Sequence, residues 1–337
     1  MKIGVDAMGG DFAPKNEILG AKLAYDVFGK KGISIFLYGI AEKIREITKQ
    51  NNIDESIFTI VNTTDTIGMG DDPTEILKTK KDSPLYRGLT DVANNQIDAF
   101  VSAGNTGATL TASTILLGRI KGVSRPTIAS FFPTTKSRPT LLVDVGATID
   151  HKSRFLYEFA LMGSTYYNIA YKVEKPTVAL LNIGEESTKG TDAIKEAYNM
   201  LKESNLNFVG NVEGRDILHG TVDVVVCDGY IGNVILKFAE SIGSMFKSKL
   251  KQISSSSFMN KIKVGLSIPA LKGLFRELDY QEYGGVPVLG VDGISIVGHG
   301  KSSPLAIMNM IKRAVELHDN QLVSKIESII KQNTIKN

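Results

Sequence analysis

The 337-residue chain has few of the residues that mark specialised protein classes, with one cysteine, four histidines and a net charge of +3. The single Cys227 excludes an intrachain disulfide and is typical of a reducing cytoplasm. No uninterrupted apolar run reaches the ~18 residues of a membrane-spanning helix. The start, MKIGVDAMGGD, shows no signal-peptide pattern. Since neither half is strongly basic, we expect a cytoplasmic globular protein that binds no nucleic acid.

Several cofactor motifs are also missing. The loop after the first predicted strand reads DAMGGDFAP and lacks the G-x-G-x-x-G of dinucleotide-binding folds. Gly300-Lys301-Ser302 ends like a phosphate-binding P-loop, but Ser295 stands where the first glycine belongs. The histidines show no metal-ligand spacing. The sequence therefore shows no dinucleotide-binding motif, no complete P-loop and no metal-ligand motif.

One stretch, IDAFVSAGNTGATL from Ile97 to Leu110, combines three elements. Ala99 to Ser102 is a short apolar run typical of a buried strand, Gly104 to Gly107 is a turn, and a helix is expected from Ala108. Backbone N–H groups at the start of a helix bind anions, and small residues let a phosphate approach. The alternative is an ordinary strand-to-helix connection.

This pattern of an apolar run followed by a polar glycine turn recurs along the chain. Loops at the carboxyl ends of strands line the ligand crevice of open α/β sheets. The repetition therefore predicts one site built from several loops on one edge of a sheet. The other turns are VDAMGGD from Val5, VDVGAT from Val143, LLNIGEE from Leu180, VVCDGYIGN from Val225 and IVGHGKSS from Ile296.

Strands and helices are predicted to alternate, which is typical of a parallel sheet covered by helices on both faces. The alternation includes a helix over 74–81 and a last strand over 293–297, while 208–216 is expected to be a polar connection. A long amphipathic pattern follows Asn233. The simplest organisation is a single domain, 1–337, with an inserted helical arm at about 240–280.

These motifs closely resemble the PlsX family, the bacterial acyl-ACP:phosphate acyltransferases of phospholipid synthesis. The resemblance covers nearly the whole chain. Phe12 stands where the family commonly has His, and Thr148 stands where it commonly has Asn. These two departures weaken any role for a histidine in the first loop and for an amide after DVGA. The motifs are DAMGGD from Asp6, SAGNTGA from Ser102, DVGA from Asp144, NIGEE from Asn182, KG from Lys189, NVEGRD from Asn211, VVVCDGYIGN from Val224, EYGG from Glu282, LGVDG from Leu289 and GHG from Gly298.

The resemblance implies a three-layer α/β/α sandwich like that of isopropylmalate dehydrogenase and phosphotransacetylase, assembled as a homodimer. It implies that inorganic phosphate attacks the thioester of acyl-ACP directly, giving acyl phosphate and free ACP, and it implies no metal and no bound cofactor. The acyl phosphate would then feed a glycerol-3-phosphate acyltransferase in the membrane. A phosphotransacetylase-like enzyme that uses acyl-CoA is the alternative.

Lys189 and Asn233 are the predicted catalytic residues. Lys189 offers a point charge for phosphate or for the developing oxyanion, and Asn233 offers an amide donor near a helix start. They could also be a solvated loop lysine and a simple helix cap. Cys227 is expected to be a core residue. The predicted phosphate- and substrate-binding residues are Asp6, Gly9, Gly10, Ser102, Gly104, Asn105, Thr106, Gly107, Asn182, Glu185, Arg215 and Asp228.

A second apolar stripe is predicted within the arm. Leu271, Leu274, Phe275 and Leu278 recur at helical spacing after Pro269 and are flanked by basic residues. Such a stripe suits peripheral contact with the inner face of an anionic membrane. Packing against the partner subunit is the alternative.

Two other classes of protein fit the sequence less well. A metal-dependent β-decarboxylating dehydrogenase shares the implied fold, but the sequence shows no acidic cluster for Mg²⁺ and no basic clamp for a dicarboxylate. A non-enzymatic adaptor on lipid surfaces would not need so many polar glycine turns.

Overall fold

A computed structural model describes residues 1–150, 152–257, 259–260, 262–263, 265, 267 and 284–333. The predicted membrane stripe, Leu271, Leu274, Phe275 and Leu278, lies outside these residues. The described strands form one eleven-stranded sheet in the order β3-β2-β1-β4-β11-β10-β5-β6-β9-β7-β8. The strands are β1 (Lys2–Asp6), β2 (Ser34–Gly39), β3 (Phe58–Asn62), β4 (Ala99–Ser102), β5 (Thr127–Phe132), β6 (Thr140–Val143), β7 (Thr177–Leu181), β8 (Asn207–Val212), β9 (Val224–Val226), β10 (Val286–Leu289) and β11 (Ile294–Val297).

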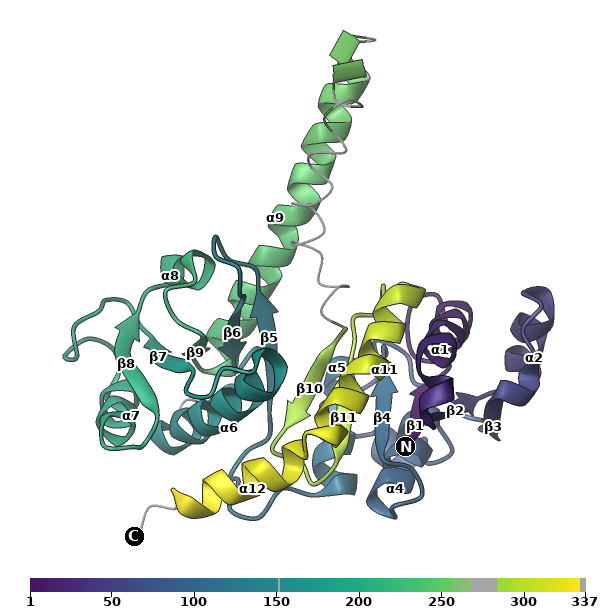
Figure 1. Ribbon diagram of the computed structural model, residues 1–337, viewed down its shortest axis with the longest axis horizontal. Coiled ribbons are helices and arrows are strands. Elements are labelled where there is room, and N and C mark those ends of the chain that lie inside the picture. The colour runs from purple at the N-terminus through teal and green to yellow at the C-terminus, as the bar shows by residue number, and fades with distance from the viewer. Residues whose placement is uncertain are drawn as a thin grey trace.

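Helices cover both faces of this sheet, as Figure 1 shows. One apolar layer packs under α1, α2, α6, α7, α11 and α12, and the other under α3, α4, α5, α8 and the base of α9. The predicted α/β/α sandwich is therefore confirmed. The helices are α1 (Lys15–Phe28), α2 (Ala41–Gln50), α3 (Ile76–Thr79), α4 (Pro84–Ala93), α5 (Thr106–Ala112), α6 (Ser153–Tyr171), α7 (Asp192–Lys202), α8 (Gly214–His219), α9 (Gly229–Ser256), α11 (Pro304–Asp319) and α12 (Leu322–Gln332), with a π-helical turn over Ser113–Leu117 after α5.

The sheet is mixed and not wholly parallel, which corrects the sequence-based expectation. β10 runs antiparallel to both β11 and β5, and β5 runs antiparallel to β6. Followed through these pairs, β6, β7, β8 and β9 run opposite to β1, β2, β3, β4 and β11. The polar glycine turns therefore fall into two sets at opposite ends of the strands, so the prediction of one shared edge is wrong.

Sheet twist brings members of the two sets back together. β4 and β6 are separated by four strand-to-strand steps, which amounts to roughly 80–100° of rotation at the usual twist per strand. Because of this rotation, the directions of β4 and β6 in space are far from opposite, although the two strands are antiparallel in the sheet. The sheet thus has two halves, one with β1, β2, β3, β4 and β11 and the other with β6, β7, β8 and β9. Loops from both halves can then reach one cavity, described below.

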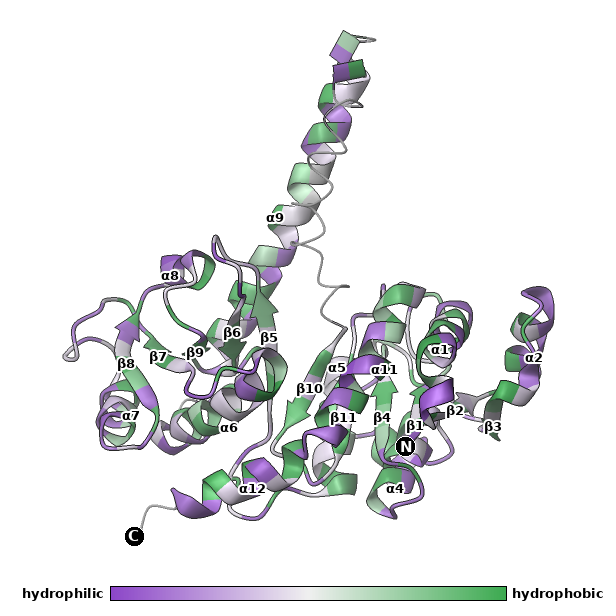
Figure 2. Cartoon of the chain, viewed as in Figure 1, coloured by the Kyte–Doolittle hydropathy of each residue, from purple (hydrophilic) through white to green (hydrophobic). Residues whose placement is uncertain are grey.

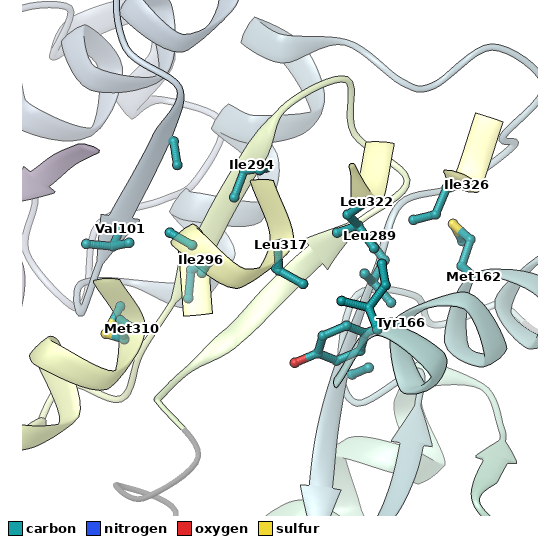
Figure 3. Close-up of a cluster of buried hydrophobic side chains, with 14 of the residues drawn as sticks. Val101, Met162, Tyr166, Leu289, Ile294, Ile296, Met310, Leu317, Leu322 and Ile326 are labelled. Carbon is teal, nitrogen blue, oxygen red and sulfur yellow. The ribbon is translucent and has the colours of Figure 1, made fainter. Parts of the chain in front are cut away.

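The hydrophobic core continues across the two halves of the sheet. Figure 3 shows Val101 and Ile296 on one side, Leu289 of β10 in the middle, and Met162 and Tyr166 of α6 on the other. Ile326 and Leu322 of α12 lie over the same seam, and every one of these side chains is at most 4% exposed. Burial of large apolar side chains is worth about 1.5–3 kcal/mol each, so the seam ties the halves firmly together.

Helix α9 begins in the body of the protein and then extends away from it (Figure 1). It forms a protruding helical arm, as the sequence predicts. Its amphipathic character is visible as alternating colours in Figure 2. Beyond the base, apolar side chains stay exposed: Phe238 is 67% exposed, Met245 52% and Phe246 51%. Exposed apolar side chains gathered on one helix face are typical of an interaction surface.

A few elements differ from the sequence-based predictions. α3 is a single turn and not a helix over 74–81. Strand β8 and helix α8 replace the polar connection expected over 208–216. Strand β10 lies before β11, at residues for which no strand was expected. β8 is an edge strand containing Gly210, and β10 contains Pro287. Both residues weaken a strand signal in the sequence.

Candidate active site

A cavity of about 290 Å³ lies where loops from the two halves meet. Its lining comes from the start of α5, the loop after β11, the base of α9 and the loop after β6, and it combines polar with apolar side chains. The lining residues are Thr106, Gly107, Leu110, Ile128, Ser130, Phe131, Val145, Gly146, Asn233, Leu236, Lys237, Glu240, Gly285, Val286, Val297, Gly298, His299, Ser302 and Ala306.

Asp6, the last residue of β1, organises a buried hydrogen-bond network that leads up to the GNTG turn. Its carboxylate accepts hydrogen bonds from Ser102 Oγ at 2.7 Å and from the Met8 amide at 3.0 Å, and Ser102 Oγ in turn accepts from the Gly104 amide at 3.1 Å. A Cβ at Gly9 would lie 2.4 Å from Asp6 Oδ2, so only glycine fits there. Burial raises the pKa of Asp6 to about 6, although these hydrogen bonds favour the ionised form.

Glu17, in the first turn of α1, packs against Gly10 in the loop after β1. Gly10 has φ of +128°, and a Cβ there would lie 2.7 Å from Glu17 Oε1. Both Glu17 oxygens are buried without a hydrogen-bond partner among the described residues. Burial, and then the charge of Asp6, raises the pKa of Glu17 to about 8. The residue is therefore mostly protonated at neutral pH, a feature that the sequence pattern does not reveal.

In the GNTG turn, Asn105 stabilises the local structure, whereas Thr106 and Gly107 line the cavity. Asn105 caps α5 by accepting from the Ala108 amide at 3.0 Å, while its Nδ2 donates to the carbonyls of Met69 and Asp71. Thr106 and Gly107 line the cavity. The predicted turn therefore does reach the site, but Asn105 serves to hold it in place.

A second buried carboxylate organises the loop after β6. Asp144 accepts from the amides of Gly146, Ala147 and Thr148 at 2.8–2.9 Å, and also from the Thr148 hydroxyl at 2.8 Å. Thr148, the departure from the family pattern, is therefore part of this turn. Burial raises the pKa of Asp144 nonetheless.

The base of α9 packs tightly against the loop of Asp144. Asp228 caps the helix by accepting from the Ile231 amide at 2.9 Å. Cys227 Sγ donates to the Asp144 carbonyl at 3.3 Å, and burial raises the pKa of its thiol well above the usual range. Buried and held in its neutral form, Cys227 is the core residue that the sequence predicts. Asn233 lines the cavity, beside Gly146.

The loop of Lys189 is not part of the cavity lining. Asn182 holds it from within by donating from Nδ2 to the Lys189 carbonyl at 3.1 Å, and Lys189 itself is exposed. Arg215 pairs with Glu213 at 3.1 Å and lies 3.7 Å from Glu185, all on the surface. The structure therefore brings Thr106, Gly107 and Asn233 together but leaves Lys189, Glu185 and Arg215 outside the lining.

Five polar residues of the lining were not assigned by the sequence analysis: Ser130, Lys237, Glu240, His299 and Ser302. The spacing from Asn233 to Lys237 and Glu240, four and seven residues, places all three on one helix face and was the available signal. Within the described ranges, no cluster of three metal-ligating side chains is present and no helix is long and apolar enough to cross a membrane.

The fold of this chain is an α/β/α sandwich of the kind found in phosphotransacetylases. A solved structure of the EutD phosphotransacetylase from Staphylococcus aureus superposes with a TM-score of 0.59 at 15% identity, covering 94% of each chain. At that identity, the likeness establishes the fold.

Sequence relatives define the family. A family model described as "Fatty acid synthesis protein" matches residues 1–325. The phosphate acyltransferase of Clostridium perfringens (strain SM101 / Type A) is 40% identical over 100% of this chain and 99% of its own length. That of Pelotomaculum thermopropionicum is 42% identical over 100% of this chain and 97% of its own. The chain therefore belongs to this fatty acid synthesis protein family, the PlsX family, and it is an acyltransferase.

Proposed function

We propose that the protein transfers a fatty acyl group from acyl-ACP to inorganic phosphate, giving acyl phosphate and free ACP for phospholipid synthesis. The observation that carries the proposal is the mixed character of the cavity. Its lining includes the polar start of α5 at Thr106 and Gly107 and the amide of Asn233, together with the apolar residues Leu110, Ile128, Val145, Leu236 and Val297. A phosphate and the start of an acyl chain are thereby accommodated side by side. An acyl-CoA donor is the alternative.

In this reaction a phosphate oxygen attacks the thioester carbonyl carbon, the new C–O bond forms, and the C–S bond breaks with its electron pair leaving on the thiolate. Phosphate is already ionised near neutral pH, so the site must mainly orient it and stabilise the oxyanion. We assign holding of the phosphate to the start of α5, at Thr106 and Gly107, and donation to the oxyanion to the Asn233 side-chain amide.

Lys189 remains a proposed catalytic residue, acting from the loop beside the cavity. Strands β7 and β9 are parallel neighbours, so the loop of Lys189 leaves the sheet at the same end as the base of α9. Asn182 orients this loop and the surface pair of Arg215 and Glu185 lies beside it. A long flexible ammonium on such a loop is suited to meeting a charge that develops at the cavity mouth.

The other predicted site residues support the cavity walls in this proposal. Asp6, Gly9, Gly10, Ser102 and Gly104 fix the path of the chain up to the GNTG turn. Asn105 and Asp228 cap the starts of α5 and α9, the helices that carry Thr106, Gly107 and Asn233.

We further propose that residues 1–337 act as one catalytic domain, that two copies form a homodimer, and that the arm contacts the cytoplasmic membrane surface. The exposed apolar stripe of α9, at Phe238, Met245 and Phe246, supports a subunit interface. The sequence pattern of Leu271, Leu274, Phe275 and Leu278 supports the membrane contact, from which a membrane glycerol-3-phosphate acyltransferase would receive the product.

The decisive experiment measures free ACP thiol after incubation of the purified protein with palmitoyl-ACP. Thiol should appear only when phosphate is present and should be unaffected by a chelator. Equal release without phosphate would refute transfer to phosphate, and faster release from palmitoyl-CoA would favour the alternative donor. Flotation with phosphatidylglycerol vesicles, comparing the wild type with the double variant Leu271→Glu/Leu274→Glu, tests the membrane contact. A variant that remains dimeric and floats as well as the wild type would rule the arm out as that contact.

A further inference from the structure

Lys237 is a cation inside the candidate site to which no role has been given. Of the described residues that line the cavity, it is the one that carries a permanent positive charge. Lys189, the lysine predicted from sequence, is not in the lining. A positive charge near a bound phosphate strengthens its binding, because it balances the charge of the anion more fully than backbone and amide dipoles do.

Its position on α9 relates Lys237 directly to Asn233. The two residues are four apart on a continuous helix, so their side chains project from one face, about one turn apart. Leu236, on the same face, also lines the cavity. The base of α9 therefore presents an amide donor, a cation and an apolar side chain to one space.

The ammonium group is already oriented by a neighbour in the cavity lining. Lys237 Nζ lies 3.1 Å from Glu240 Oε2, and the side chain of Glu240 is 27% exposed against 61% for Lys237. An exposed ion pair of this kind contributes little to stability. A lysine ammonium has three donors, however, so it can keep Glu240 and still bind an anion with the remaining hydrogens.

We infer that Lys237 is a phosphate-binding residue of this site, which holds inorganic phosphate next to Asn233, and that Glu240 is the positioning residue that orients it. This inference rests on the proposed function. It moves the principal positive charge from the outer loop of Lys189 to the helix that forms the cavity wall.

The test compares Lys237→Met with Lys237→Arg and with Lys22→Met. Lys22 is a matched control, because it also forms an ion pair within one helix, with Asp26 at 2.6 Å, and lies outside the cavity lining. Loss of one charge-assisted hydrogen bond should raise the KM for phosphate about tenfold to a hundredfold in Lys237→Met. The KM for acyl-ACP should stay unchanged, Lys237→Arg should recover much of the loss, and Lys22→Met should behave as wild type.

A second measurement does not depend on turnover. Inorganic phosphate should raise the unfolding temperature of the wild type and of Lys22→Met but not that of Lys237→Met. An unchanged KM for phosphate in a folded Lys237→Met protein, or a rise confined to the KM for acyl-ACP, would overturn the assignment. The latter result would place Lys237 on the phosphate of the carrier's prosthetic arm. If wild-type thiol release proves independent of phosphate, the proposed function fails, and the unfolding measurement still decides whether Lys237 binds phosphate.

Discussion

Replacement of Glu17 by Gln should remove a large pH dependence from the stability of this protein. Glu17 is 1% exposed, both its oxygens are unpartnered among the described residues, and its carboxyl is buried beneath Gly10. Burial, helped by the charge of Asp6, raises its pKa from 4.5 to about 8. In the unfolded chain the same carboxyl is exposed to water and titrates at its ordinary value.

The sign and size of the effect follow from proton linkage. Between about pH 4.5 and pH 8 the folded protein keeps a proton on Glu17 that the unfolded chain releases. Stability therefore falls as the pH rises through this window. Asp6, whose pKa is raised to about 6, acts in the same direction at lower pH. Above pH ~6.5 the loss from Glu17 dominates and amounts to roughly 1.5 kcal/mol by pH ~8.

The assay is thermal unfolding at fixed protein concentration from pH ~6.5 to pH ~8, in buffers without phosphate. For a chain of 337 residues, 1.5 kcal/mol corresponds to about 2 °C in the unfolding temperature. Glu17→Gln should lose this decline whatever its absolute stability, whereas Glu42→Gln, at an exposed position in the first turn of α2, should keep it. If Glu17→Gln declines as steeply as the wild type, the assignment of a buried, protonated carboxyl is refuted.

Three further predictions concern the site. Asn233→Ala and Lys189→Ala should each lower turnover about 10²–10³-fold with the fold intact, the scale for losing one preorganised donor, and thiol release measures it; full activity in either variant would remove that residue from the mechanism. Gly232→Ala should destabilise the protein by about 3 kcal/mol in denaturant unfolding, because a Cβ there would lie 1.8 Å from the Asp144 carbonyl oxygen, and an unaltered midpoint would contradict this packing. Cys227→Ser should keep most of its activity, because the thiol is buried and stays protonated; an inactive but folded variant would indicate an acyl-enzyme instead.

Much of the fold could be predicted from local patterns. Strand β4 lies at the residues expected for it, Ala99–Ser102, and a helix, α5, leaves the GNTG turn as expected, with Asn105 as its cap. Periodicity and capping are properties of neighbouring residues. The reversal at β5 and β10 was missed because strand direction depends on pairing between distant segments, and Pro287 further obscured β10.

The candidate site was predictable only in part, for the same reason. The glycine turns identified the loops, and the residues at Gly107 and Asn233 do line one cavity. Which polar side chains face inward depends on sheet twist and helix orientation. Asn105 is therefore a helix cap, Lys189 lies outside the cavity lining, and Lys237 lies in the lining.

The buried seam in Figure 3 determines how a substrate can reach the cavity. Swinging the two halves apart would expose Met162, Tyr166, Leu289 and Ile326, each at most 1% exposed. At about 1.5–3 kcal/mol per side chain, this opening would cost roughly 6–12 kcal/mol. Fewer than about one molecule in ten thousand would be open at any moment. For the proposed binding of an acyl chain in this cavity, entry would therefore depend on rim loops and side chains, and not on separation of the two halves.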